Sequence, residues 1–278
     1  MDLCLLTLIT CIGSSAPNLP IQAPYTCTCA PTTVQEVLPN QLLTQLSVEQ
    51  LRDLAHSITV KVVSGNNWGS GILIQRQGQV YTVLTNKHVL TAGAPYRTQT
   101  SDGQMYFADL SGSISLGGND LALLQFRSTH TTYAVASLGN AAPLKIGDEV
   151  FAAGFPFAGD WSDSIGFVLT TGQVSLLLDR ALVGGYQVGY TNEIRKGMSG
   201  GPILNRQGEL VGINGMHKYP LWGDPYIYKD GSKPDLLLRP LMVHSSWGIP
   251  IKTFAELAPQ FSSSSTLSFT LTPFSLKE

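Results

Sequence analysis

Cysteine is missing from most of this chain, because all four cysteines, Cys4, Cys11, Cys27 and Cys29, precede residue 30. The main body therefore cannot be cross-linked by disulfides, and its stability has to come from packing. Cys27 and Cys29 resemble half of a metal site, but no second pair of ligands follows at the spacing of a zinc site. We expect neither a metal nor a cofactor.

A large excess of charge of one sign is also missing. The chain has 17 basic and 19 acidic residues, a net charge of −2. This balance provides no basic stripe for phosphates, so nucleic acid is not an expected partner. The apolar run at residues 3–12 is too short to span a bilayer, so we expect no stable membrane span. With 278 residues, 43% of them hydrophobic, the chain is long enough for one or two globular units.

The first 41 residues have the features of a leader followed by a linker. The apolar run at 3–12 and the small residues up to Ala16 resemble a secretory signal, although Asp2 precedes the run and no Lys or Arg does. Export to a periplasm or to the outside is one interpretation, and a cytoplasmic protein with a disordered leader is the alternative. Ala16 to Gln41 is rich in Pro, Thr and Gln without a period, which predicts no packed structure.

A globular domain is predicted at 42–259, followed by a flexible tail at 260–278 that begins with serines 262–265. Ser47 to Gln50 has the form of a capping box and predicts a short helix. Short β-runs separated by turn residues follow it, and they favour a sandwich or barrels over a parallel sheet. The predicted strands are 58–63, 71–74, 81–85, 105–110, 121–126, 149–153, 172–177, 185–191, 202–204 and 210–214.

One serine lies among glycines in Gly-Met-Ser-Gly-Gly-Pro at 197–202. Glycines let backbone N–H groups approach a substrate carbonyl closely, as an oxyanion hole requires. The N–H groups of Gly197 and Ser199 are the predicted donors. Upstream, His88 ends an apolar strand and Asp120 opens another, so the order along the chain is His, Asp, Ser. Each position alone is compatible with an ordinary turn or surface residue, but the three together indicate nucleophilic catalysis.

These motifs resemble those of a trypsin-like (chymotrypsin-fold) serine protease, and are most similar to the HtrA/Deg protease domain and to bacterial stand-alone trypsin-like peptidases. The resemblance runs from about residue 58 to 254, and no PDZ domain follows Phe254 in this sequence. Matching segments include LTNKHV at 84–89, NDLALLQF at 119–126, GMSGGPILN at 197–205, GELVGIN at 208–214 and WGIPI at 247–251.

The resemblance implies an all-β fold of two six-stranded antiparallel barrels, at about 56–140 and 141–255, with the active site in the cleft between them. It implies a serine endopeptidase acting on proteins or peptides, with Ser199 as nucleophile, His88 as general base and Asp120 orienting the histidine. A catalytically silent protease fold used as a binding module is the alternative. Two departures from the family pattern keep it open.

Met198 is the first departure, because digestive trypsin-like enzymes carry there an aspartate that pairs with a freshly cut N-terminus. HtrA-type enzymes carry asparagine, so a neutral residue does not argue against activity, but what holds the loop in register is left open. Gly215 is the second. The family usually has Ser or Thr there, whose hydroxyl supports the triad carboxylate, so Asp120 needs another donor.

Substrate preference depends on Glu193, which lies six residues before Ser199 at the base of the implied specificity pocket. An exposed Glu193 favours a basic substrate side chain. If Glu193 instead pairs with Arg195, the pocket is lined by Ile194 and His217 and favours small or apolar side chains.

A segment between 217 and 246, absent from a minimal HtrA-like domain, contains several aromatic residues: Tyr219, Trp222, Tyr226 and Tyr228. We call it the 217–246 insertion. It is interpreted either as a flap whose aromatic residues contact substrate or as a hairpin whose aromatic residues pack on the barrel.

Overall fold

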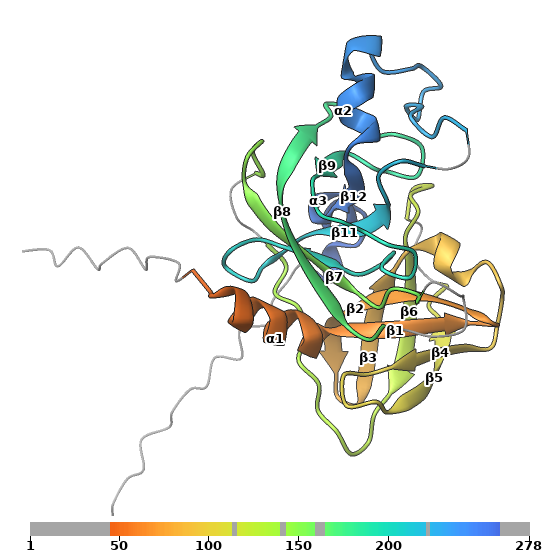
Figure 1. Cartoon of the computed structure of the whole chain (residues 1–278). Coiled ribbons are helices and arrows are strands. Elements are labelled where there is room, and N and C mark those ends of the chain that lie inside the picture. The colour runs from red at the N-terminus through yellow and green to blue at the C-terminus, as the bar shows by residue number, and fades with distance from the viewer. Residues whose placement is uncertain (1–44, 113–115, 140–142, 159–164, 221–222, 262–278) are drawn as a thin grey trace, which may run out of the picture. The chain divides into compact units, whose positions relative to one another are not determined.

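Two β-barrels and a few short helices make up the computed structural model, which describes residues 45–112, 116–139, 143–158, 165–220 and 223–261 (Figure 1). The predicted leader at 1–41 lies outside these residues, as does almost all of the predicted tail. Within them, no helix is long and apolar enough to cross a membrane.

The first barrel closes in the strand order β1-β2-β3-β6-β5-β4, and every pair is antiparallel. Its strands are β1 (Thr59–Ser64), β2 (Asn67–Gln77), β3 (Val80–Thr85), β4 (Tyr96–Gln99), β5 (Met105–Leu110) and β6 (Ala122–Arg127). A 3₁₀ turn, η1 (Lys87–Leu90), follows β3.

The second barrel closes in the order β10-β11-β12-β9-β8-β7, again with antiparallel pairs only. Its strands are β7 (Glu149–Gly154), β8 (Val168–Leu177), β9 (Val188–Tyr190), β10 (Pro202–Leu204), β11 (Leu210–Met216) and β12 (Ser246–Pro250). The remaining elements are η2 (Leu236–Leu238), α2 (Arg239–Val243), α3 (Ile251–Leu257) and η3 (Pro259–Phe261). The prediction of two six-stranded antiparallel barrels is confirmed.

Sequence reasoning located ten of these strands and missed β4 and β12. β4 reads Tyr-Arg-Thr-Gln, a short polar run without the alternation that marks a strand. β12 contains a glycine and ends in proline, both unfavourable in strands. Both strands form because the neighbouring strands of a closed barrel pair with them, although their own sequences have little preference for a strand.

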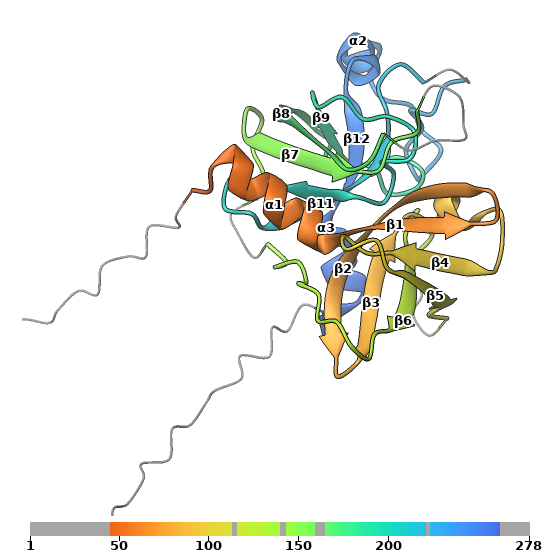
Figure 2. The same cartoon turned by 60° about the horizontal axis from the view of Figure 1, so that its bottom comes forward.

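The predicted helix is present as α1 (Val48–Ile58), and its start is fixed by a complete capping box. The Gln50 backbone N–H donates to Ser47 Oγ at 3.1 Å, and the Gln50 side-chain oxygen accepts from the Ser47 N–H at 2.8 Å. These bonds satisfy backbone donors that the first helical turn leaves free. One face of α1 is buried, and the helix contacts β1, β2 and β7, so it touches both barrels (Figure 2).

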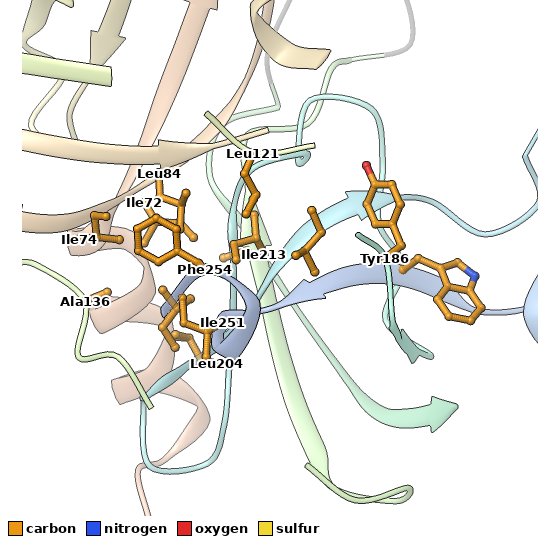
Figure 3. Close-up of a cluster of buried hydrophobic side chains, with 14 of the residues drawn as sticks. Ile72, Ile74, Leu84, Leu121, Ala136, Tyr186, Leu204, Ile213, Ile251 and Phe254 are labelled. Atoms are coloured by element: carbon orange, nitrogen blue, oxygen red, sulfur yellow. The ribbon is translucent and has the colours of Figure 1, made fainter. Parts of the chain in front are cut away.

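A buried apolar cluster joins the two barrels. It combines Ile72 and Leu84 from the first barrel with Leu204 and Ile213 from the second, and Phe254 of α3 lies among them (Figure 3). Phe254 is fully buried. Burial of apolar side chains contributed by both barrels holds one barrel against the other.

The 217–246 insertion packs much of its aromatic surface into the same cluster. Tyr226 and Tyr228 are 1% and 5% exposed, and the Tyr226 hydroxyl donates to the Met242 carbonyl at 3.1 Å. Tyr219 is 50% exposed, and Trp222 lies outside the described residues. Burial of Tyr226 and Tyr228 favours the packing interpretation of this segment.

Replacement of Phe254 by alanine tests the joining cluster. Removing a fully buried phenylalanine is expected to lower the free energy of unfolding by about 3–5 kcal/mol, measured by denaturant titration. Lys252→Ala, in the same helix at a side chain 85% exposed, is the control and should change it by less than about 0.5 kcal/mol. Equal losses for the two variants would contradict a role for Phe254 in joining the barrels.

Candidate active site

His88 lies in η1, which begins two residues after the end of β3 in the first barrel. The turn is bonded to the segment that precedes β6, because the Asn86 side-chain amide donates to the Asp120 carbonyl at 2.8 Å. The His88 side chain is 46% exposed, so a substrate can reach its ring.

Asp120 precedes β6 in the first barrel and holds His88 by two bonds. The His88 backbone N–H donates to Asp120 Oδ1 at 2.8 Å, and His88 Nδ1 lies 2.5 Å from Oδ2. A carboxylate only accepts, so this contact places the imidazole hydrogen on Nδ1 and leaves the Nε2 lone pair free to take a proton. The Asp120 side chain is only 16% exposed, which strengthens its interactions with the ring.

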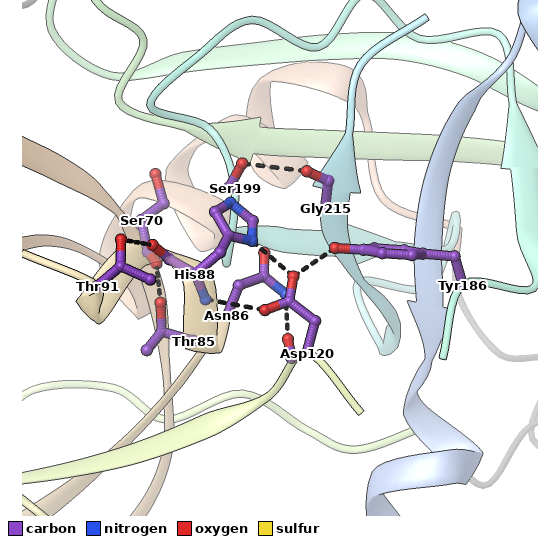
Figure 4. A network of polar contacts seen from close by, with 9 residues as sticks. All are labelled: Ser70, Thr85, Asn86, His88, Thr91, Asp120, Tyr186, Ser199 and Gly215. Atoms are coloured by element: carbon purple, nitrogen blue, oxygen red, sulfur yellow. Dashed lines mark hydrogen bonds and ion pairs between the residues drawn. The ribbon is translucent and has the colours of Figure 1, made fainter. Parts of the chain in front are cut away.

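Ser199 comes from the second barrel, in the loop before β10. Its side chain lies beside the His88 ring, with Asp120 on the far side of that ring (Figure 4). In this structure the Ser199 hydroxyl donates to the Gly215 carbonyl at 3.1 Å. The predicted residues His88, Asp120 and Ser199 are thus brought together from three segments of the chain.

A turn at residues 195–198 contains Gly197, the first predicted oxyanion donor, and is followed directly by Ser199, the second. Met198 N–H donates to the Arg195 carbonyl at 3.0 Å, and Gly197 has φ +95°. These features fit a type II turn, whose third residue needs positive φ and is therefore glycine. Among the hydrogen bonds of the described residues, none uses the N–H of Gly197 or Ser199. Both donors are therefore available to a ligand oxygen.

The carbonyl groups of residues 195–199 all accept hydrogen bonds, which fixes the direction of these peptides. Lys196 O accepts from Phe157 N–H at 3.0 Å and Gly197 O from Ser70 Oγ at 2.8 Å. Ser199 O accepts from Ser70 N–H at 2.8 Å. A peptide whose carbonyl is bonded on one side must point its N–H to the other, so these contacts keep the Gly197 N–H on the open side.

The side chain of Met198 explains how the loop around Ser199 keeps its position without an ion pair. Its side chain is fully buried in the core of the second barrel, beside Val150, Tyr190 and Ile194. Burial of this apolar side chain anchors the loop where digestive enzymes use a charged aspartate.

The predicted specificity residues are arranged around this loop. Glu193 Oε1 accepts from Arg195 Nη2 at 3.0 Å and from Nε at 3.1 Å, and both side chains are more than half exposed. Ile194 is 4% exposed and packs into the barrel core. His217 Nδ1 lies 2.8 Å from the Lys218 carbonyl and so carries a hydrogen.

Tyr186 is a site residue that sequence reasoning missed. Its hydroxyl donates to Asp120 Oδ2, the oxygen that also faces His88 Nδ1. Gly215 signalled that Asp120 needed another donor, but nothing in the sequence points to a tyrosine 66 positions away. Among the described residues, no group of three His, Cys, Asp or Glu side chains is arranged to hold a metal ion.

Two closed six-stranded barrels, with this site between them, define the chymotrypsin-like class of fold. Residues 69–213 match the model of the trypsin-like peptidase domain family, and the chain belongs to that family. The fold also resembles that of a serine endoprotease from Yersinia pestis, with a TM-score of 0.56 at 23% identity, over 79% of this chain and 68% of that one.

Curated relatives include the serine protease Do-like HtrA of Bacillus subtilis, 35% identical over 156 residues, or 53% of this chain and 33% of the relative. The periplasmic pH-dependent serine endoprotease DegQ of Escherichia coli is 34% identical over 146 residues, covering 52% of this chain and 30% of the relative. The matched part of the chain thus spans about a third of the length of these relatives.

Gly197→Ala tests the close packing of the loop. A Cβ at this position would collide with the Phe155 carbonyl oxygen and lie 2.9 Å from the Phe157 ring. Gly147 is the matched control, with φ +92° and open space around it. Thermal or denaturant unfolding should show a loss of about 1–2 kcal/mol for Gly147→Ala from backbone strain alone, and about 1–3 kcal/mol more for Gly197→Ala. Equal losses would contradict the described contacts.

Proposed function

We propose that the chain is a serine endopeptidase in which Ser199 is the nucleophile, His88 the general base and acid, and Asp120 the carboxylate that orients the histidine. The observation that carries the proposal is the arrangement around His88. Nδ1 is held by Asp120 at 2.5 Å, the ring lies beside Ser199, and two unused backbone N–H groups adjoin the serine.

In the proposed first step, Ser199 Oγ attacks the carbonyl carbon of the substrate peptide while His88 Nε2 takes the hydroxyl proton. The resulting imidazolium is stabilised by Asp120. His88 then gives the proton to the leaving amine, which departs and leaves an acyl group on Ser199. Water, deprotonated by His88, attacks the acyl group and releases the second product.

The negative oxygen of each tetrahedral intermediate is assigned to the N–H groups of Gly197 and Ser199. Donors already in place need no rearrangement when the charge develops, and removing one such donor elsewhere costs about 3–4 kcal/mol. The hydrogen-bonded carbonyls of Lys196 and Met198 support this assignment, because they share their peptide groups with the N–H donors of Gly197 and Ser199 and hold them in position before substrate arrives.

A catalytically silent binding module is disfavoured, because both departures that suggested it have a counterpart in the structure. Burial of Met198 anchors the loop, and Tyr186 supplies the donor that Gly215 lacks. The bond from Ser199 Oγ to Gly215 O does not favour the silent module either. A serine hydroxyl rotates about a single bond, and catalytic hydrogen bonds commonly form only when substrate is present.

For substrate preference, we propose a small or apolar side chain at the residue whose carbonyl is attacked. The ion pair between Glu193 and Arg195 engages the carboxylate that would otherwise attract a basic side chain. His217 remains as the proposed pocket residue, whereas Ile194 packs into the core of the second barrel and supports the loop from behind.

Export to a periplasm or beyond is the proposed location, and proteins or peptides there are the proposed substrates. DegQ of Escherichia coli and a DegP-like relative from Marinomonas are named as periplasmic endoproteases. A body without cysteine is compatible with an oxidising compartment.

Labelling with a fluorophosphonate tests the proposed nucleophile. The wild-type protein should form a covalent adduct, Ser199→Ala should form none, and His88→Ala should react at least about 100-fold more slowly, since general-base catalysis contributes about that much. The exposed His130→Ala is the control and should react like wild type. A folded wild-type protein that neither reacts nor cuts a peptide library would refute the proposal.

Arg195→Ala tests the proposed preference. Without its partner, Glu193 is free to attract cations, so cleavage after Lys or Arg should rise severalfold relative to cleavage after Ala or Leu in a peptide library. Arg206→Ala also removes one arginine from an ion pair, with Glu149 at 3.4 Å, and should leave the preference unchanged. If wild type already prefers basic residues and Arg195→Ala does not alter that preference, the pairing does not control it.

A further inference from the structure

Asp120 binds a second partner besides the histidine it orients. Oδ1 accepts from the His88 backbone N–H, while Oδ2 faces both His88 Nδ1 and the Tyr186 hydroxyl. Tyr186 approaches from the side opposite the imidazole and comes from the second barrel, so the carboxylate lies between the two rings (Figure 4). Tyr186 is only 6% exposed. A buried hydroxyl donating to a carboxylate is a strong, charge-assisted contact.

Gly215 and Tyr186 occupy complementary space. A Cβ at position 215 would collide with Cε1 of the Tyr186 ring and lie 2.8 Å from its Cζ and hydroxyl oxygen. The family's usual Ser or Thr at this position therefore cannot coexist with Tyr186 in its present place. The absence of a side chain at position 215 therefore makes room for the Tyr186 ring and its hydroxyl.

The loop that carries Tyr186, residues 178–187 between β8 and β9, reaches from the second barrel to the aspartate segment of the first. Asp120 N–H donates to the Gly184 carbonyl at 2.7 Å, and Asn119 forms a parallel bridge with Gly184. The loop is closed by Leu182 N–H donating to the Tyr186 carbonyl at 2.8 Å. Its backbone therefore fixes the distance between the phenol and the carboxylate.

The 217–246 insertion backs this loop from outside. Val183 N–H donates to the Ile227 carbonyl at 2.8 Å, and Lys229 N–H to the Ala181 carbonyl at 3.1 Å. Lys229 Nζ also donates to Asn119 Oδ1 at 2.5 Å, directly beside the triad aspartate in sequence. The insertion is thus bonded both to the loop that carries Tyr186 and to the segment that carries Asp120.

We propose that Tyr186 is a positioning residue for the proposed triad, whose phenol hydroxyl does for Asp120 what a Ser or Thr at position 215 does in the family. The insertion holds the loop that presents it. This inference rests on the proposed peptidase function, since Tyr186 acts through Asp120 and His88 and touches no reacting atom.

The protonation state of the phenol fits the donor role. Burial and the adjacent Asp120 carboxylate both raise the pKa of Tyr186 above its ordinary value. The phenol therefore keeps its proton throughout the neutral pH range and can only donate to a carboxylate that is ionised.

Tyr186→Phe is the direct test, because it removes the hydroxyl and keeps the buried ring. A hydrogen bond to a charged group has a net value that corresponds to about a tenfold to hundredfold change, so kcat for a peptide substrate should fall by about that factor while KM stays within about twofold. Tyr81→Phe is the control, since its hydroxyl accepts from Tyr133 N–H at 2.9 Å in the first barrel, away from the site. It should leave kcat unchanged.

Rescue separates a positioning hydroxyl from a ring that only fills space. Tyr186→Ala with Gly215→Ser places a hydroxyl in the vacated space, and its kcat should exceed that of Tyr186→Ala with Gly215→Ala by about tenfold, the ratio expected for one charge-assisted bond. The two double variants differ by a single oxygen atom, so differences in folding largely cancel. Equal kcat values, or an unchanged kcat in Tyr186→Phe, would overturn the role of Tyr186 and leave the peptidase proposal standing.

A substrate-free measurement keeps this inference separate from the proposed function. The low-field NMR signal of the His88 Nδ1 proton reports on the Asp120 contact whether or not the protein cleaves peptides. It should shift in Tyr186→Phe and stay in place in Tyr81→Phe. An unmoved signal in both variants would show that Tyr186 does not influence the contact between His88 and Asp120.

Discussion

Contact between the two barrels is the constraint on which the site depends, because each barrel carries only part of it. His88 and Asp120 belong to the first barrel and Ser199 to the second, so a small shift between the barrels would separate the proposed nucleophile from the proposed base. Burial of Phe254 and its neighbours stabilises this contact. Hydrogen bonds from Ser70 fix the position of the Ser199 loop against the first barrel. Ser70 is a first-barrel residue whose backbone N–H and hydroxyl bond to the carbonyls of Ser199 and Gly197.

The same principle explains how the chain tolerates its two departures from the family pattern. In both places a contact with another part of the fold takes over from the missing side chain. At position 198, burial of the Met198 side chain takes the place of an ion pair. The carbonyl groups of the residues around it accept hydrogen bonds from Phe157 and Ser70. At position 215, glycine has no hydroxyl group, and Tyr186 of the second barrel occupies that space and donates its own hydroxyl to Asp120. Neither replacement needs a disulfide or a metal.

The fold class and three residues of the candidate site could be predicted because their signals are local. The two-barrel class followed from motifs in order, and the capping box at Ser47 located the first helix correctly. β4 and β12 escaped because their short sequences carry no alternation and form only where neighbouring strands pair with them. Tyr186 escaped for a related reason. Its contact with Asp120 spans 66 positions and depends on a loop that is hydrogen-bonded to the insertion, so no spacing in the sequence encodes it.

A crystal structure with a peptide boronate bound would test the central claim most directly, because boron forms a tetrahedral adduct with a reactive serine. The account predicts a bond from boron to Ser199 Oγ, one boronate oxygen within hydrogen-bond distance of the N–H groups of Gly197 and Ser199, and His88 Nε2 facing the adduct. A boronate bound elsewhere or without a covalent bond, or an adduct whose oxygen avoids both N–H groups, would contradict it.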